Sequence, residues 1–152
     1  MYYENLSAAG IPMTVVSDGF AVTEIRRGSA PFDFPCAVTA EACRQLKEYF
    51  GRCRKEITFP ISLDSHPNAT PFRLKVWQAL MRISYGETVT YSELADMIGC
   101  EDGARAVGGA VGANPILVAV PCHRVVAKDN IGGFSAGLDL KRLLLEIEGV
   151  KY

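Results

Sequence analysis

The stretch TYSELADMIGCEDGARAVGGAV, residues 90–111, carries the signals for two short helices joined by a tight turn. Thr90 with Glu93 three residues later forms a capping-box pattern, which predicts a helix start, and Gly99 predicts that helix's end. Asp102 is the expected N-cap of the second helix. Two short helices joined by a turn that contains glycine are typical of a helix-turn-helix, and we expect one here.

Helices are also predicted on both sides of this stretch. Thr70-Pro71 supplies an N-cap followed by proline at the first helical position, and Tyr85-Gly86 is the expected end of that helix. Residues 138–148 show apolar residues at helical spacing, which predicts a last helix. Between them, the apolar run 116–120 is expected to be a buried extended segment, and residues 131–137 form a glycine-rich loop.

The N-terminal part has a different pattern. Residues 11–27 hold two apolar runs separated by an Asp-Gly pair, which predicts a β-hairpin. Residues 39–51 have helical spacing, and residues 59–70 have the composition of a linker. We therefore expect a small α/β domain over residues 1–66, with a small β-sheet and a helix. A mainly α domain containing the helix-turn-helix should follow over residues 67–152.

Composition places the protein in a broad class. Hydrophobic residues make up 49% and charged residues 22% of the 152 residues, which predicts a globular protein with a real core. No apolar run is long enough to cross a bilayer, and no secretion signal precedes the first hairpin, so we expect a cytoplasmic protein without membrane contact.

Charge and metal-binding residue types limit the function further. The net charge of −1 gives no support for nucleic-acid binding, so any DNA site must rest on a local patch. The five cysteines show no paired spacing, and the two histidines, His66 and His123, are far apart. We expect reduced thiols, no metal site and no cofactor.

Cys122 is the first candidate for chemistry. It lies in the sequence VPCHRV, residues 120–125, between Pro121 and the pair His123-Arg124. A nearby imidazole or guanidinium lowers the pKa of a thiol, and the thiolate is the reactive form. A working Cys-His pair needs a turn here, because neighbouring residues on a strand point to opposite faces. The alternative is a buried structural cysteine beside a surface His-Arg pair.

The glycines of the second predicted helix need an explanation, since each one costs about 1 kcal/mol relative to alanine in a helix interior. One explanation is close approach to another surface, such as a DNA backbone or minor groove. Tight helix–helix packing or a plain loop is the other. The small side of this helix would hold Ala104, Ala106, Gly108 and Ala110.

Two polar residues flank or interrupt this small surface. Arg105 is the only charged residue on it, and is either a solvated surface charge or a ligand contact. Asn114 precedes Pro115, which pushes it out of the helical region and ends the helix. Its amide is either a simple stop signal or is turned back towards the Cys122 segment.

Together these motifs resemble a known family. Residues 72–149 resemble the O6-alkylguanine-DNA alkyltransferases, also called methylated-DNA–protein-cysteine methyltransferases. The matching pieces follow the family's order: Val76-Trp77, Tyr85-Gly86-Glu87-Thr88-Val89-Thr90-Tyr91, Leu94-Ala95, Arg105-Ala106-Val107-Gly108-Gly109-Ala110, Asn114-Pro115, Val120-Pro121-Cys122-His123-Arg124-Val125-Val126, Gly132-Gly133-Phe134-Ser135 and Lys141 to Gly149. The helix that ends at Gly51 is a weaker match.

The resemblance implies a reaction at Cys122. This thiol would attack the alkyl carbon on guanine O6, with His123 as a base acting through a bound water. Glu148 would hold the imidazole, with Glu146 as the competing carboxylate. Tyr91 would donate a proton or hydrogen bond to the departing guanine. Asn114 would brace the turn that carries the thiol.

The resemblance also implies how the base is bound. The backbone at Cys122 and Val125, with Ser135, would read the guanine edge, and Phe134 would wall the pocket. The product thioether is stable, so each molecule would react once. The protein is expected to be a monomer.

The implied partner is double-stranded DNA that contains O6-alkylguanine. The target nucleotide would be rotated out of the stack, with Arg105 filling its place. The residues implied to contact the minor groove are Ala104, Ala106, Gly108 and Tyr91. Those implied to contact phosphates are Ser92, Arg73 and Lys128.

This sequence departs from the family's pattern in a few places. Phe134 stands where tyrosine is usual, Ser84 replaces a proline, and Ala113 replaces a glycine. The acids Glu101 and Asp102 lie near the implied DNA face and are expected to weaken DNA binding.

Three other functions remain as alternatives. A non-catalytic alkyl-lesion binder of the same fold would lack the reactive cysteine, which is present here. A cysteine hydrolase would leave the glycine-rich helix unexplained. A plain helix-turn-helix regulator would be expected to show more base-reading side chains than Arg105 alone.

Overall fold

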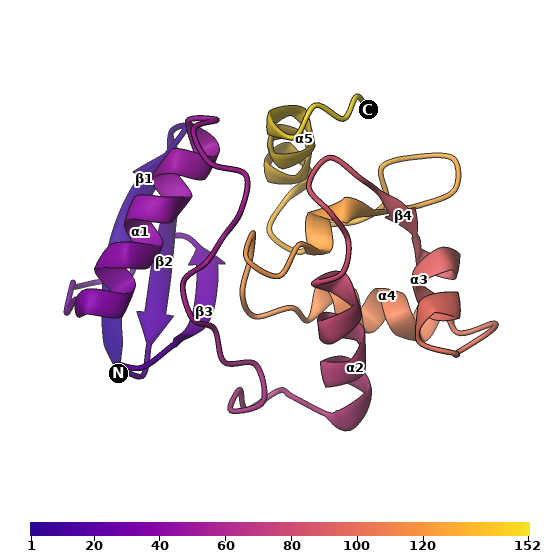
Figure 1. The fold of residues 1–152 in the computed structure, drawn as a ribbon, viewed down its shortest axis with the longest axis horizontal. Helices are drawn as coiled ribbons and strands as arrows, with labels where there is room; N and C mark the ends of the chain where they lie inside the picture. Colours follow the sequence, from indigo (N-terminus) through magenta and orange to yellow (C-terminus); the bar gives the residue numbers. More distant parts are fainter. The chain divides into compact units, whose positions relative to one another are not determined.

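The structure is a computed structural model that describes residues 1–152, and it divides into two compact units (Figure 1). The first unit consists of Met1–His66 and Pro115–Ala119. The second consists of Pro67–Asn114 and Val120–Tyr152. No helix in either unit has the length and apolar character needed to span a membrane.

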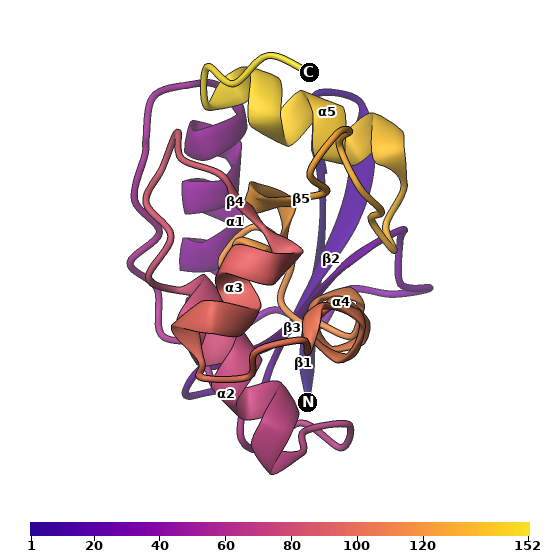
Figure 2. The same cartoon turned by 90° about the vertical axis from the view of Figure 1, so that its right-hand side faces the viewer.

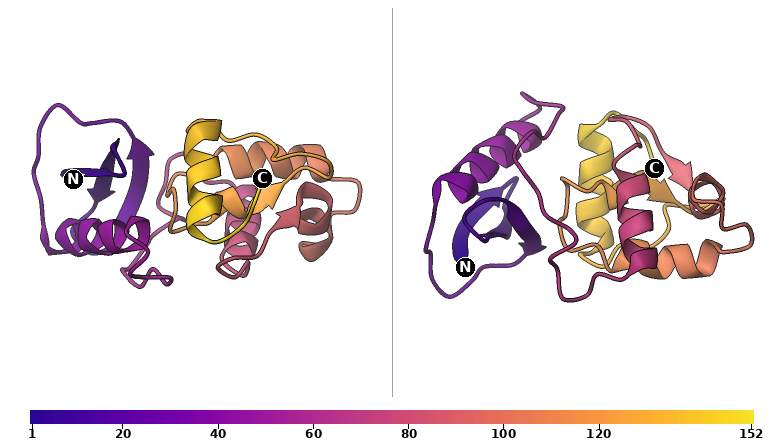
Figure 3. Two further views of the ribbon diagram at one scale, coloured as in Figure 1. Left: turned by 90° about the horizontal axis from the view of Figure 1, so that it is seen from above. Right: turned by 60° about the horizontal axis from the view of Figure 1, so that its bottom comes forward.

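The first unit is built on a three-stranded antiparallel sheet in the order β1-β2-β3. Its strands are β1 (Tyr2–Ala8), β2 (Ile11–Ser17) and β3 (Val22–Arg27). Figure 3 shows the ribbon from two further sides. The hairpin predicted over residues 11–27 is confirmed as β2 and β3. Strand β1 was not predicted, because its alternating polar residues give a weak apolar signal.

One helix, α1 (Ala37–Phe50), packs against this sheet. It begins two residues before the predicted start and ends at the C-cap Gly51. Burial of apolar side chains from both layers drives this packing. The largest buried side chains of this core are Met13, Ile25, Leu46 and Tyr49.

The segment Pro115–Ala119 belongs to the same unit because it pairs with β3. The backbone N–H of Ile25 donates to the Pro115 oxygen at 2.9 Å, and the N–H of Leu117 donates to the Ile25 oxygen at 3.2 Å. All five residues are buried. The prediction that residues 116–120 are buried is therefore confirmed, but the prediction that they are extended is wrong: residues 117–119 form a turn, in which Val118 has a φ of +69°.

The second unit is mainly helical (Figure 2). Its helices are α2 (Pro71–Leu80), α3 (Tyr91–Met97), α4 (Ala104–Gly112) and α5 (Leu138–Ile147). A short 3-10 turn, η1 (Cys122–Arg124), is followed by β5 (Val125–Val126), which pairs in parallel with β4 (Val89–Thr90). The predicted fold class is confirmed.

The helix-turn-helix consists of α3 and α4, which pack on each other and on α2. The fully buried Trp77 of α2 donates its indole N–H to the Ala110 oxygen at 2.9 Å. This bond fixes α4 against α2 and turns Ala110 inward. Placing Ala110 on the small outer side was therefore wrong, because a 3.6-residue period sets it beside the buried Val107.

Most helix starts follow the predicted capping. The Thr70 hydroxyl accepts from the Arg73 N–H at 3.1 Å. The Thr90–Glu93 capping box forms with both hydrogen bonds, at 3.1 and 2.9 Å. Asp102, however, is not the N-cap of α4; that position is Gly103, without a side-chain cap. A Cβ at Gly103 would overlap the Cys100 sulfur, so only glycine fits there.

Two helix ends also differ from the prediction. Helix α2 ends at Leu80 instead of Tyr85-Gly86, because the N–H groups of Arg82 and Ile83 bond three residues back and tighten the chain into turns. Helix α4 ends at Gly112, two residues before Asn114.

The parallel pair β4–β5 positions the site. Val89 lies opposite Val125, and Thr90 lies opposite Val126. Since β4 runs directly into α3 and β5 follows η1, this pairing brings Tyr91 next to the turn that holds Cys122.

Candidate active site

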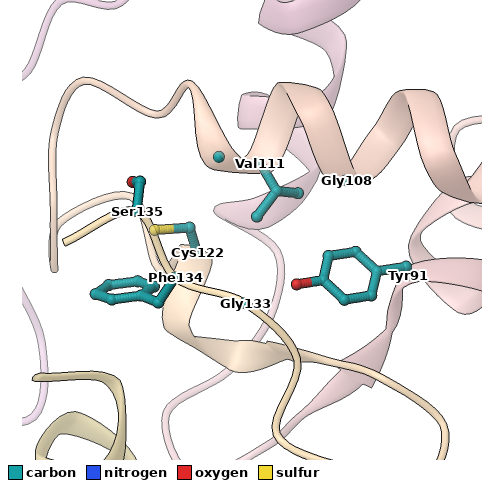
Figure 4. Close-up of a pocket in the computed structure, with 8 residues that line it drawn as sticks. Tyr91, Gly108, Val111, Cys122, Gly133, Phe134 and Ser135 are labelled. Carbon is teal, nitrogen blue, oxygen red and sulfur yellow. The ribbon is translucent and has the colours of Figure 1, made fainter. Parts of the chain in front are cut away.

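A cavity of about 160 Å³ lies between α3, α4 and the loop before α5 (Figure 4). Cys122 lies at its wall, and the Tyr91 hydroxyl points into it. The full lining is Tyr91, Gly108, Val111, Gly112, Cys122, Gly133, Phe134 and Ser135. The cavity thus combines a thiol, a phenol and a serine hydroxyl within mostly apolar walls.

Cys122 begins the turn η1, for which Pro121 is the N-cap. The predicted turn is therefore present. Cys122 is only 3% exposed, and burial raises the pKa of its thiol to about 11. A hydrogen bond with Asn114 and the positive charge of Lys141 act in the opposite direction. The thiol is protonated at neutral pH and needs a base before it can attack.

The neighbours of Cys122 in sequence do not lower its pKa. His123 and Arg124 are both buried and both bond to Glu148. Neither side chain is among the groups that shift the pKa of the Cys122 thiol, and their burial excludes the alternative of a surface His-Arg pair. Adjacent residues of the turn point in different directions, so closeness in sequence is not closeness of charge.

Glu148 is the centre of a buried polar network. Its Oε2 lies 2.7 Å from His123 Nε2, and its Oε1 accepts from Arg124 Nε at 2.8 Å. Arg124 Nη2 adds a bond of 3.0 Å to Oε2, and the Gly86 N–H donates to Oε1 at 3.0 Å. These donors hold the pKa of Glu148 far below its usual range, although burial opposes them. The carboxylate is therefore ionised.

The ionised carboxylate sets the state of His123. A carboxylate only accepts hydrogen bonds, so the Nε2 of His123 carries the proton and Nδ1 holds the lone pair. Burial lowers the pKa of His123, which keeps the imidazole neutral. A neutral, oriented imidazole is the form required of a general base.

Arg124 ties the network to the turn after α2. Its Nη1 donates to the Ile83 oxygen at 2.6 Å, and its guanidinium lies 5.8 Å from the centre of the Tyr85 ring. The Tyr85 hydroxyl donates to the Ile147 oxygen at 3.0 Å. The guanidinium is thus a structural partner of Glu148.

The Tyr91 side chain packs closely against Gly132. A Cβ at Gly132 would lie 3.0 Å from the Tyr91 hydroxyl oxygen and 3.1 Å from the Ala127 nitrogen. Gly132 also has a φ of +77°, which side chains rarely adopt. Burial raises the pKa of Tyr91, and a backbone hydrogen bond from Gly133 opposes this. The phenol therefore keeps its proton and can donate it.

Asn114 connects the two residues that flank the segment 115–119, which are Asn114 itself and Val120. Its Nδ2 donates to the Val120 oxygen at 2.8 Å, two residues before Cys122. The same side chain hydrogen-bonds to the Cys122 thiol and lowers its pKa. These bonds connect Asn114 to the turn that carries Cys122, where the family resemblance implies a stabilising side chain.

The remaining pocket residues divide into two groups. Phe134 and Ser135 line the cavity. Val125 does not, because its side chain is buried in β5 and its carbonyl accepts from Lys141 at 2.6 Å. Of the two carboxylates considered, Glu148 bonds to His123, whereas Glu146 is exposed.

The predicted DNA contacts lie mostly on the surface. Arg105 and Ala106 are exposed on α4, and Ala104 is half-buried. Gly108 faces Tyr91, since a Cβ there would lie 3.7 Å from the ring. A Cβ at Gly109 or Gly112 would meet nothing within 4 Å, so packing inside the protein does not require these two glycines.

The predicted phosphate contacts come from three other segments. Ser92 is exposed on α3 and Lys128 is exposed on the loop after β5. Arg73 is half-buried and donates to the Asn68 oxygen at 2.9 Å. The structure does not gather these three residues into one cluster with Cys122.

Lys141 is the site residue that sequence reasoning missed. Its side chain is completely buried on α5. The sequence places Lys141 only in the last helix, because nothing in the neighbouring residues indicates that this lysine is buried. The structure contains no group of three or more His, Cys, Asp or Glu side chains that could hold a metal ion.

Comparisons with known proteins agree with this geometry. Residues 71–150 match the family model described as 6-O-methylguanine DNA methyltransferase, DNA binding domain. A methylated-DNA–protein-cysteine methyltransferase of Saccharolobus islandicus is 46% identical over 111 residues, which is 73% of this chain and 70% of that protein. One from Haemophilus influenzae is 51% identical over 87 residues, 57% of this chain and 49% of that protein.

Solved structures extend the likeness to both units. The Mycobacterium tuberculosis OGT in complex with DNA superposes with a TM-score of 0.87 at 35% identity, over 97% of this chain and 92% of that one. The O6-methylguanine-DNA methyltransferase of Pyrococcus kodakaraensis has a TM-score of 0.64 at 30% identity, over 97% and 98% of the two chains.

The fold and the matches define a DNA-repair protein, and its structure has a buried thiol at the wall of a cavity. The chain belongs to the family of 6-O-methylguanine DNA methyltransferases. It is thus a methyltransferase of direct-reversal DNA repair, and DNA is its partner. The resemblance found over residues 72–149 is confirmed.

Proposed function

We propose that this protein transfers an alkyl group from O6 of guanine in double-stranded DNA to the sulfur of Cys122, once per molecule. The observation that carries the proposal is the position of Cys122. Its thiol lies on a cavity of about 160 Å³ that also holds Tyr91 and Ser135, beside the buried His123–Glu148 pair. Four other free cysteines are present, and none of them lines this cavity.

The reaction starts with removal of the thiol proton. His123 accepts it at Nδ1 through a water molecule, and the Glu148 carboxylate stabilises the imidazolium that forms. The sulfur then attacks the alkyl carbon in line, so that the S–C bond forms as the bond from carbon to O6 breaks. Guanine leaves with the electron pair of that bond.

The proton balance closes through Tyr91. Its phenol donates a proton to the departing guanine, which makes guanine a better leaving group, and the phenol recovers a proton from the imidazolium. The net products are neutral guanine in DNA and a neutral thioether at Cys122. No group in the cavity can break the S–C bond again, so the protein acts once.

The target base must leave the duplex to reach this cavity, which costs a few kcal/mol. Arg105 is the side chain that takes its place in the stack. The exposed, open positions of Gly109 and Gly112 favour close approach of α4 to the minor groove. Ser92 and Lys128 contact the flanking phosphates.

The proposal extends to the working form of the protein. The second unit holds every group named in the reaction. Residues 1–66, which make up the first unit together with Pro115–Ala119, form a separate N-terminal domain. The protein works as a monomer in the cytoplasm, where a reducing milieu keeps the five free cysteines as thiols.

Intact-mass measurement after incubation with a duplex that contains one O6-methylguanine tests the proposal. We expect each protein molecule to gain one methyl mass and no more in excess DNA. The variant Cys122→Ser should bind the same duplex and gain none. A methyl gain by Cys122→Ser, or repair of several duplexes per molecule, would overturn the proposal. Binding without any gain by the wild type would favour a non-catalytic lesion binder.

A further inference from the structure

Lys141 is a buried cation without a carboxylate partner. Its Nζ donates to the Val125 oxygen at 2.6 Å and to the Gly133 oxygen at 2.9 Å. The nearby carboxylate of Glu148 is taken by His123 and Arg124. Burying an ammonium with only two neutral hydrogen-bond acceptors is unfavourable. We therefore expect its charge to stabilise another group nearby.

The group that benefits is Cys122. The positive charge of Lys141 lowers the pKa of the Cys122 thiol, and a thiolate at Cys122 raises the pKa of Lys141. The other groups that face Cys122 are neutral at neutral pH. They are the Asn114 amide and the Tyr91 phenol. The buried His123 imidazole of the same turn is neutral as well. Burial lowers the pKa of Lys141 to about 8, which leaves it protonated at pH 7.

The two hydrogen bonds give Lys141 a second effect on the site. Val125 follows η1 directly, and Gly133 belongs to the cavity wall next to Phe134 and Ser135. One ammonium therefore joins the residue that follows the cysteine turn to the Gly133 wall of the cavity. Figure 4 shows Gly133 and the loop around Phe134 beside Cys122.

We propose that Lys141 is a positioning residue of the transfer reaction, which supplies the countercharge for the forming Cys122 thiolate and fixes the Gly133 wall of the pocket. This rests on the proposed function, since it takes Cys122 as the nucleophile. The sequence suggests Arg124 as the cation that acts on the Cys122 thiol. The proposal gives this role to Lys141 of α5 instead.

The first test measures the thiol without DNA. Cys122 is alkylated with iodoacetamide at several pH values between 7 and 9, and its peptide is followed by mass spectrometry. Lys141→Met should react about tenfold more slowly than wild type at pH 7, because the thiolate fraction falls tenfold for each unit of pKa. The difference should shrink towards pH 9, because the Lys141 ammonium, with its pKa of about 8, loses its proton in the wild type. Arg142→Met removes a charge from the exposed neighbour on α5 and should match the wild type.

The sign of this change separates charge from structure. A variant that only loosened the pocket would expose Cys122 and speed its alkylation. Equal or faster reaction of Lys141→Met would therefore overturn the proposal. Lys141→Arg keeps the charge and should react within about threefold of wild type. If Lys141→Arg is instead as slow as Lys141→Met, or if Lys141→Met fails to fold and Lys141→Arg is slow, the countercharge role is refuted.

The second test measures single-turnover methyl transfer from a duplex containing O6-methylguanine. Lys141→Met should transfer about tenfold more slowly at pH 7.5, while its affinity for the duplex stays within about twofold of wild type. Failure of the proposed function would appear as absence of transfer in the wild type. The iodoacetamide result would still decide the role of Lys141 in that case.

Discussion

Cys122 in the second unit and Cys43 in the first are equally buried thiols with different surroundings. Each residue is 3% exposed, and burial raises the pKa to about 11 for Cys122 and to about 12 for Cys43. Around Cys43 the largest cause after burial is the Glu4 carboxylate, which raises the pKa further and outweighs the opposite effect of the Lys47 charge. Around Cys122, Asn114 and Lys141 lower it.

If Cys122 is the acceptor, as we propose, burial alone does not decide which thiol reacts. A buried thiol stays inert next to a carboxylate, because a second negative charge is unfavourable there. The same thiol becomes a nucleophile when a base, a hydrogen-bond donor and a cation converge on it beside a cavity. Each prediction below removes one of these differences or checks that it matters.

The largest effect is expected from removing the two thiols in turn. Cys122→Ala should abolish methyl transfer, since no other thiol lines the cavity. Cys43→Ala should leave the transfer rate unchanged and destabilise the protein by about 1–2 kcal/mol through loss of a small buried side chain. Transfer rates and urea unfolding measure the two effects. If Cys43→Ala remained folded but lost methyl transfer, the claim that only Cys122 takes part in the reaction would be contradicted.

The next effect is expected at the buried carboxylate. Glu148→Gln removes the charge that orients His123 and leaves Arg124 without its ion-pair partner. We expect transfer to fall about 10³-fold and stability to fall by about 3–5 kcal/mol. Single-turnover kinetics and urea unfolding measure both.

Glu146→Gln is the matched control, two residues away and exposed. It should change stability by less than about 0.5 kcal/mol and leave transfer intact. If the two variants behaved alike, the assignment of Glu148 would be wrong.

A smaller effect is expected at the proton donor. Tyr91→Phe keeps the ring packed against Gly108 and removes only the hydroxyl. Transfer should slow by about 10², the lower range for a general acid, while Cys122 alkylation by iodoacetamide stays unchanged. Single-turnover rates with the two reagents make the measurement. A parallel loss in both reactions would mean that the hydroxyl acts on the thiol instead of the leaving guanine.

The smallest effect is expected from pH. His123 must be neutral to accept the thiol proton, and burial lowers its pKa below the ordinary 6.5. Protonation therefore removes the base only in acid. The transfer rate should not fall between pH 8 and 6.5, and should drop by up to tenfold per unit below the lowered pKa. A decline that begins above pH 7 would contradict a neutral, buried His123.

Local signals explain which parts of the fold could be predicted. The Thr70 cap and the Thr90–Glu93 capping box depend on residues within one helical turn, and both form as expected. Asp102 failed as a cap because its backbone is left-handed, with a φ of +63°, whereas an N-cap residue is usually extended, and Gly103 is the N-cap instead. The early end of α2 depends on tight turns that apolar spacing does not reveal.

Long-range contacts explain what the sequence could not indicate at the site. Local spacing does not connect His123 and Arg124 to Glu148, which lies 24 or more positions away along the chain. The family resemblance implied the bond from Glu148 to His123, but nothing in the sequence implied the bond to Arg124. Lys141 reaches Val125 across 16 positions. Only the packing of α5 against η1 reveals which cation acts on the thiol.

The most direct test of the account is a methyl map of all five cysteines after reaction with an O6-methylguanine duplex. The protein is digested, and each cysteine peptide is weighed by mass spectrometry. The account predicts one methyl on Cys122 and none on Cys36, Cys43, Cys53 or Cys100. A methyl on the equally buried Cys43, or on any cysteine other than Cys122, would contradict the claim that the surroundings of Cys122 select it as the acceptor.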